Sequence, residues 1–214
     1  PHDDGGSSTI MEGVTDPFGS YGLNNLNQGV FTTMSYNDGW KTNPDGPPPA
    51  NAAYGYQGTP MAIDIAVLQM KYGANTKFHK GNDTYVLPDA NEVGTFYSCI
   101  WDAGGRDKIV CESDTAAAIN LRAATLKAKA GGGGYISNVD GVYGGFTIAN
   151  TVKIESAEGG GGDDVIVGNK AANRLRGGDG DDILRGGGGN DRIEGEGGDD
   201  MLFGGKGRDM LSAG

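Results

Sequence analysis

The sequence predicts a mainly β protein: a right-handed parallel β-roll with flanking β-sandwich strands, preceded by a loop-rich segment with one helix. Residues 159–212 repeat every nine positions with one aliphatic residue per unit, and short periods of this kind are typical of solenoids. Short segments with β character, separated by turn residues, fill much of residues 78–158. Glycine accounts for 41 of the 214 residues, which suits tight turns between short strands.

The first part of the chain, residues 1–77, is rich in Gly, Asn, Pro and Asp, so we expect long ordered loops. One helix is expected from Met61 to Tyr72, with Thr59 as its N-cap, Pro60 at the first helical position and Gly73 as the stop. Apolar residues recur at helical spacing along this segment, which indicates core packing: Met61, Ile65, Leu68 and Tyr72.

The second part, residues 78–214, is expected to be a β-sandwich and β-roll domain, with the boundary near Asn75–Lys80. Before the repeats, its expected strands are Thr84–Leu87, Thr95–Trp101, Lys108–Cys111, Ala118–Arg122, Phe146–Ala149 and Val152–Ser156.

Two cysteines, Cys99 and Cys111, are equally distant from Gly105. A hairpin centred on Gly105 would place them opposite each other, and a disulfide there would fit an extracellular protein. The alternative is a pair of free cysteines buried in a core.

The nonapeptide pattern is Gly-Gly-x-Gly-x-Asp-x-U-x, where U is a large aliphatic residue. It recurs six times without a gap. The aliphatic positions are Ile166, Leu175, Leu184, Ile193, Leu202 and Leu211; the sixth positions are Asp164, Asn173, Asp182, Asp191, Asp200 and Asp209. Two copies depart from the pattern: Gly168–Arg176 loses three consensus residues, and Glu196 replaces a second glycine.

This composition indicates calcium binding. Calcium takes six to eight hard oxygen ligands, which aspartates and inward-facing backbone carbonyls can supply. Two nonapeptides would make one turn of a flattened helix, so the aspartates of every second nonapeptide stack, and the Asn173–Asp191 pair should form the weakest site. The expected glycine positions are Gly160, Gly162, Gly178, Gly180, Gly187, Gly189, Gly198, Gly205 and Gly207. The free energy gained by burying six aliphatic side chains is small compared with the conformational entropy lost when the whole segment becomes ordered. A bound cation is therefore needed to stabilise the fold. A flexible Gly/Asp-rich linker is the alternative, but it would not keep an aliphatic residue in phase.

The net charge of −11 argues against nucleic acid as a partner. No run of 18 apolar residues occurs, so no membrane span is expected. The chain begins without a methionine, in residues that look like the middle of a loop, and we expect it to be part of a larger protein.

Four motifs resemble the serralysins, secreted zinc metalloproteases of the metzincin group. FTTMSY (residues 31–36) resembles the metzincin Met-turn, and the 60–75 segment is similar to the end of a serralysin catalytic domain. WDAGG (residues 101–105), then Ile154-Glu155, then the repeats follow in the order that serralysins have. The resemblance implies that residues 1–77 are the remnant of a metzincin catalytic domain.

The resemblance also implies roles for particular residues. Tyr36 matches the Met-turn tyrosine that reaches the zinc or steadies the transition state, and Met34 matches the methionine beneath the metal. Further calcium ligands are implied at Asp102, Gly104, Asp107 and Glu155. The loop Lys80–Thr84 resembles another calcium loop but has an extra residue. The cysteine pair is not a usual feature of the family.

The resemblance implies Zn²⁺, protein or peptide substrates, an extracellular location and the type I secretion machinery for the parent enzyme. The zinc motif HExxHxxGxxH is missing, since the only histidines are His2 and His79. We therefore expect this chain alone to have no peptidase activity. The main alternative is a non-catalytic RTX calcium-binding module of an adhesin or toxin, which would not need the 31–36 motif or the helix. A lipase-type repeat protein would need a Gly-x-Ser-x-Gly elbow, which the sequence lacks.

Overall fold

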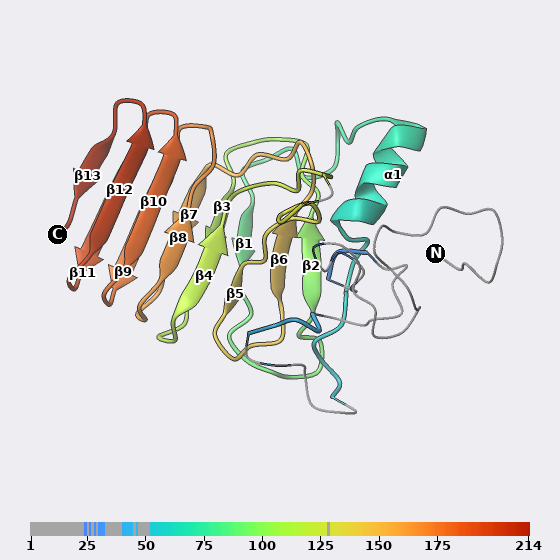
Figure 1. The fold of residues 1–214 in the computed structure, drawn as a ribbon, viewed down its shortest axis with the longest axis horizontal. Helices are drawn as coiled ribbons and strands as arrows, with labels where there is room; N and C mark the ends of the chain where they lie inside the picture. The colour runs from blue at the N-terminus through green and yellow to red at the C-terminus, as the bar shows by residue number, and fades with distance from the viewer. Residues whose placement is uncertain are drawn as a thin grey trace.

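The computed structural model describes residues 24, 26, 28, 30–32, 40–44, 46, 52–127 and 129–214. Within these residues the protein is mostly β, with one helix, α1 (Ala62–Tyr72). Figure 1 shows the strands stacked side by side toward the C-terminus, with α1 at the opposite end from β13. The mainly β, parallel-sheet fold expected from the repeats is confirmed.

Two parallel sheets build the roll. The six-stranded sheet has the order β1 (Thr84–Val86), β3 (Lys108–Val110), β7 (Ser156–Glu158), β9 (Arg174–Asp179), β11 (Arg192–Gly197) and β13 (Met210–Ser212). The five-stranded sheet has the order β12 (Met201–Lys206), β10 (Ile183–Gly188), β8 (Val165–Val167), β4 (Ala117–Asn120) and β5 (Asn138–Val139). Among the described strands of these sheets, only β4 and β5 pair in antiparallel fashion. Strands β2 (Tyr97–Ile100) and β6 (Gly145–Ile148) form a separate parallel pair.

The nine-residue period sets the register of the roll. Ile193 pairs with Leu175 and with Leu211, and Leu184 pairs with Ile166 and with Leu202, so each aliphatic residue meets its counterparts two nonapeptides away. Successive nonapeptides therefore alternate between the two sheets. The aliphatic side chains from Ile166 to Ile193 are fully buried between the sheets, whereas Leu211 on the last strand is 46% exposed. The predicted stacking of every second nonapeptide is confirmed.

The strands that precede the repeats continue the same two sheets. Ile109 on β3 pairs with Ala157 on β7, which pairs with Leu175 on β9. On the other sheet, Ile119 of β4 pairs with Ile166 of β8. All five side chains are buried. One apolar ladder thus runs along each sheet, through the repeats and the flanking strands alike.

The structure corrects the strand expected at Val152–Ser156. Strand β7 begins only at Ser156, where Ser156 N and Glu155 N both donate to Asp107 O. Val152 and Ile154 are buried although they lie outside any strand. The alternation of apolar and polar residues here arises because the connecting segment is buried, and not because it pairs with a strand. A period of two in the sequence does not distinguish these two cases.

The expected disulfide is also wrong. Cys99 and Cys111 are free and buried. No hairpin forms around Gly105 within the described residues, because β2 pairs in parallel with β6 whereas β3 pairs in parallel with β1 and β7. The residues between them connect two different sheets, so the cysteines do not face each other.

Helix α1 begins at Ala62, one residue after the expected Met61. Its N-cap is Met61 rather than Thr59, and the Asp64 carboxylate accepts a hydrogen bond from Met61 N at 2.9 Å. The Thr59 hydroxyl instead accepts from Cys99 N at 2.9 Å, which ties the helix entry to β2. Met61, Ala62 and Ile65 are buried, and Gly73 ends the helix as expected.

The second half of the expected apolar stripe does not pack. Leu68 is 36% exposed and Tyr72 74% exposed. The first turn is held from the other side by Thr32, whose hydroxyl donates to Asp64 at 2.6 Å. The division into residues 1–77 and 78–214 stays a proposal; α1 and β2 share one apolar core.

Glu196, alone among the described non-glycine residues of the repeats, adopts a backbone conformation normally reserved for glycine. Its φ is +81°, at the position where other copies have Gly178, Gly187 and Gly205, also with positive φ.

A non-glycine residue with positive φ costs about 1 kcal/mol of stability. We expect Glu196→Gly to raise the free energy of unfolding by about that amount, because glycine adopts a positive φ without this cost. The variant also loses the ion pair between Glu196 and Arg176, but that pair is half-exposed and therefore weak. Denaturant unfolding at fixed calcium would measure it. Glu194→Gly is the matched control and should destabilise, because Glu194 pairs with Arg174, Arg176 and Arg192; a loss of stability in Glu196→Gly would contradict the prediction.

The two thiols should be unreactive in the folded protein. Burial raises the pKa of Cys99 to about 12 and also raises the pKa of Cys111, and the thiolate is the reactive form. Titration with a thiol reagent, without reductant, should find two thiols per chain after unfolding and almost none before. The Cys99→Ser variant should show one reactive thiol after unfolding. If the unfolded wild-type chain showed none, the two cysteines would be joined in a disulfide.

Candidate calcium-binding turns

Four turns of the roll share one backbone geometry. In the copies that begin at Gly177, Gly186, Gly195 and Gly204, the second and fourth residues all have positive φ. None of the corresponding residues in the first two copies, Gly160, Gly162, Asn169 and Ala171, has positive φ. The six copies therefore fall into two classes that the sequence pattern alone treats as one.

The turns stack so tightly that a side chain at most of their glycines would collide with a neighbouring turn. A Cβ on Gly178 would lie 2.1 Å from Gly160 O, and one on Gly207 would lie 1.6 Å from Gly189 O. The sixth-position carboxylate folds back over the first glycine of its own copy: a Cβ on Gly177 would lie 1.9 Å from Asp182 Oδ2. Glycine at these positions leaves room for a carboxylate against bare backbone.

The sixth-position side chains form a column at each edge of the roll. Asp164 N donates to Asp182 Oδ1 at 2.7 Å, and Asp182 N donates to Asp200 Oδ1 at 3.1 Å. At the other edge Asn173 N donates to Asp191 Oδ1 at 2.8 Å, and Asp191 N donates to Asp209 Oδ1 at 2.9 Å. Each aspartate thus uses one oxygen to fix the backbone of the preceding turn at its own edge.

The second oxygen of three of these carboxylates has no hydrogen-bond partner among the described residues. Oδ2 of Asp182, Asp191 and Asp200 is buried and makes no hydrogen bond. Burial raises the pKa of Asp182 to about 6, with Asp164 and Asp200 adding repulsion, and burial also raises the pKa of Asp191. Buried anionic oxygens are costly unless they are paired with a cation or coordinate a metal. Hard oxygen ligands in this number suit Ca²⁺.

The turn Gly168–Ala172 is built differently. Asn173 Nδ2 donates to Glu155 O at 3.1 Å and Ile154 O at 3.4 Å, and Asn173 Oδ1 accepts from Asn169 N at 2.8 Å. Asn169 Nδ2 donates to Ile154 O at 2.8 Å and Leu121 O at 3.2 Å. Amide groups thus donate to backbone carbonyls here, in a turn that lacks the positive φ pair. The departures of this copy from the consensus form a hydrogen-bonded turn of their own.

A second acidic group lies where the first strands of the roll begin. Asp102 and Asp107 lie in one loop, and Glu155, which is distant in sequence, joins them. Asp107 N donates to Glu155 Oε2 at 3.0 Å, and Gly104 N donates to Asp102 Oδ1 at 2.6 Å. Asp107 Oδ1 accepts from Asp83 N at 2.8 Å, whereas Asp107 Oδ2 is buried without a partner among the described residues. Burial raises the pKa of Asp107.

Two further residues, His79 and Asp83, lie beside this group and were not among the expected ligands. One ligand atom each from His79, Asp83 and Asp102 lies within 4.8 Å of the others. Asp83 Oδ2 is buried without a hydrogen-bond partner in the described part of the chain. The signal in the sequence was the likeness of the Lys80–Thr84 loop to a calcium loop; its extra residue obscured which carboxylate to choose. Met34 and Tyr36 lie outside the described residues.

Comparison with known proteins identifies the family of the repeats and relatives of a longer stretch of the chain. Residues 158–193 and 176–211 each match the family described as RTX calcium-binding nonapeptide repeat (4 copies). The chain is similar to "Serralysin" of Proteus mirabilis, 37% identical over 156 residues, which cover 68% of this chain and 28% of that protein. It is 38% identical over 147 residues to "Serralysin C" of Dickeya chrysanthemi, covering 64% of the chain and 27% of the relative.

"Metallopeptidase AprA" of Pseudomonas marginalis is 34% identical over 131 residues, 56% of this chain and 25% of the relative. The chain therefore spans about a quarter of the length of the curated relatives it matches. Among the described residues, no helix has the length and apolar character to cross a membrane.

Asn173→Asp tests how the amide turn is held. The new carboxylate would face Ile154 O and Glu155 O, and both hydrogen bonds donated by the amide would be lost. In the presence of a chelator we therefore expect the free energy of unfolding to fall by about 1–3 kcal/mol. Calcium should recover part of that loss, because a cation can bridge the carboxylate and the carbonyls. Asn173→Ala is the control, which loses the same bonds but should gain nothing specific from calcium. Thermal unfolding with and without calcium would decide; full stability of Asn173→Asp in chelator would contradict the assignment.

Proposed function

We infer that this chain, a serralysin-type sequence with RTX calcium-binding repeats, uses Ca²⁺ held in its repeat turns to complete the fold of the β-roll. The observation that carries the inference is the set of buried Oδ2 atoms of Asp182, Asp191 and Asp200, which have no hydrogen-bond partner among the described residues. Each lies in a stacked column of carboxylates that repel one another unless a cation lies between them.

We assign the strongest sites to the turns with positive φ. At one edge Asp164, Asp182 and Asp200 would supply carboxylates, and at the other Asp191 and Asp209. Backbone carbonyls of the tight turns would complete the shell; the glycines concerned are Gly160, Gly162, Gly178, Gly180, Gly187, Gly189, Gly198, Gly205 and Gly207. Asn173 is the exception, because its amide already bonds the carbonyls beside it. The Asn173–Asp191 position would therefore be the weakest.

We assign a further calcium site to Asp102, Gly104, Asp107 and Glu155, with Asp83 as an added ligand. The support is the pair of buried oxygens on Asp83 and Asp107 that lack a hydrogen-bond partner within the described residues. This site would tie the Lys80–Thr84 loop, the loop after β2 and the segment before β7 to one ion. Strands β1, β3 and β7, which follow these three segments, would then depend on calcium as the repeats do.

The proposal for the whole protein is a secreted zinc metalloendopeptidase that acts on protein or peptide substrates. The support is that similarity to the serralysin of Proteus mirabilis covers 156 residues, well beyond residues 158–211 that carry the repeats. Tyr36 and Met34 would belong to its zinc site, and residues 1–77 to its catalytic domain. Type I secretion would deliver it outside the cell, where calcium is abundant. A non-catalytic RTX module accounts for the repeats but not for the matching residues outside them.

Calcium-dependent folding can be tested with two matched variants. Asp182 is fully buried and is linked to both Asp164 and Asp200, whereas Asp209 is half-buried and is linked only to Asp191 among the described residues of its column. If each site contributes about 2.7 kcal/mol at calcium a hundredfold above its Kd, Asp182→Ala should cost up to about twice as much as Asp209→Ala. Circular dichroism during calcium titration would show it, with loss of β signal in chelator.

Two outcomes would count against the proposal. An unchanged, fully folded β spectrum in chelator would mean that the roll does not need calcium. Equal losses in the two variants, or a smaller loss in Asp182→Ala, would mean that carboxylates are not shared between successive turns.

A further inference from the structure

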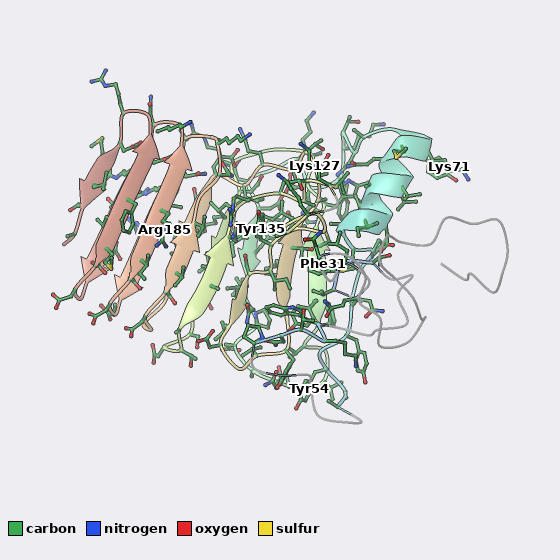
Figure 2. The ribbon with its side chains drawn as sticks, viewed as in Figure 1. Phe31, Tyr54, Lys71, Lys127, Tyr135 and Arg185 are labelled. Atoms are coloured by element: carbon green, nitrogen blue, oxygen red, sulfur yellow. The ribbon has the colours of Figure 1, made fainter. Side chains whose placement is uncertain are left out.

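A groove of about 1000 Å³ opens beside the ends of strands β4, β8, β10 and β12. Five of its lining residues are basic: Arg122, Lys153, Lys170, Arg185 and Lys206. Among the described residues no aspartate or glutamate lines it, in a chain whose net charge is −11. Arg185 and Tyr135, which are labelled in Figure 2, both line the groove.

The cations of the groove differ from those of the opposite sheet in lacking carboxylate partners among the described residues. On the six-stranded sheet Arg174, Arg176 and Arg192 all pair with Glu194. In the groove only Lys153 forms an ion pair, with Glu155, within the part of the chain that the structure describes. Arg122, Lys170, Arg185 and Lys206 are exposed, and none of the four forms an ion pair with a carboxylate among the described residues. This arrangement favours an anionic ligand.

We propose that this groove binds a short, extended, acidic segment of polypeptide. Several of its lining residues are small, among them Ala123, Ala124, Ala171 and Gly188, and such residues allow a backbone to approach closely. Lys170 and Lys206 lie on either side of Gly188, two rungs apart along the sheet. That separation is about 10 Å, close to three residues of an extended chain.

Tyr135, the aromatic residue among the described residues that line the groove, argues for a peptide rather than a sugar or a nucleobase. The Arg122 guanidinium lies 3.8 Å from the centre of the Tyr135 ring. Outside the lining, the Arg185 guanidinium lies 5.0 Å from the centre of the Phe203 ring. A ring already covered by a guanidinium does not offer the open face that bases stack on. A long polyanion would also extend over the acidic remainder of the chain, whereas a short segment would contact only the groove.

The experiment measures fluorescence anisotropy of labelled octaglutamate against the full chain in a buffer of fixed free calcium. The test variant is Lys170→Gln/Lys206→Gln. The matched control is Lys71→Gln/Lys77→Gln, which removes the same charge at exposed lysines outside the groove. We expect saturable, salt-sensitive binding that weakens about tenfold in the test variant and less than about twofold in the control. Octaglutamine should not bind, and circular dichroism checks that both variants fold.

Three outcomes would overturn the proposal. The first is no saturable binding of octaglutamate. The second is an equal loss in the test and control variants, which would show attraction without a site. The third is tighter binding of dextran sulfate than of octaglutamate with the same dependence on Lys170 and Lys206, which would assign the groove to anionic glycans.

Discussion

The stacking of carboxylates from every second nonapeptide is the constraint on which the rest of the roll depends. Each aspartate gives one oxygen to the backbone of the preceding turn on its edge, as Asp182 does to Asp164 N. The other oxygen of Asp182, Asp191 and Asp200 is buried without a donor among the described residues. A backbone amide fixes the position of each carboxylate but cannot neutralise it, so folding without a cation accumulates buried negative charge at both edges. The same stacking that aligns the strands therefore makes a cation necessary.

The turn at Gly168–Ala172 shows a second solution to the same packing problem. There Asn169 and Asn173 donate amide hydrogens to the carbonyls of Leu121, Ile154 and Glu155. An amide satisfies carbonyls without adding charge, so this turn can close without an ion. It lies against the segment before β7, where the repeats meet the flanking strands. At this edge the column of sixth-position side chains thus begins on a turn held by neutral hydrogen bonds, and the turns of Asp191 and Asp209 stack onto it.

The sequence was sufficient to predict features set by its local period and insufficient where distant strands decide the outcome. The positions of Ile166, Leu175, Leu184 and Ile193 predicted the register, because a strict nine-residue repeat leaves one way to bury all four. The hairpin around Gly105 failed because β2 and β3 find parallel partners, β6 and β7, that come much later in the chain. The prediction of Thr59 as the N-cap was wrong because its hydroxyl accepts a hydrogen bond from Cys99 N instead. Asp83 was missed because membership of a site formed by three loops depends on how those loops meet, which no local pattern encodes.

The two faces of the roll use their cations in different ways. On the six-stranded sheet, arginines on neighbouring strands share Glu194 and so reinforce the contact between β9 and β11. Along the groove, Lys170 and Lys206 occupy equivalent positions of the repeat, but the copy between them carries Gly188 rather than an acid. An acidic residue there would have neutralised both lysines at no cost to the strand, as Glu194 does for its neighbours. The repeat therefore leaves Lys170 and Lys206 exposed on one face of a strongly acidic protein, without an ion pair to a carboxylate among the described residues.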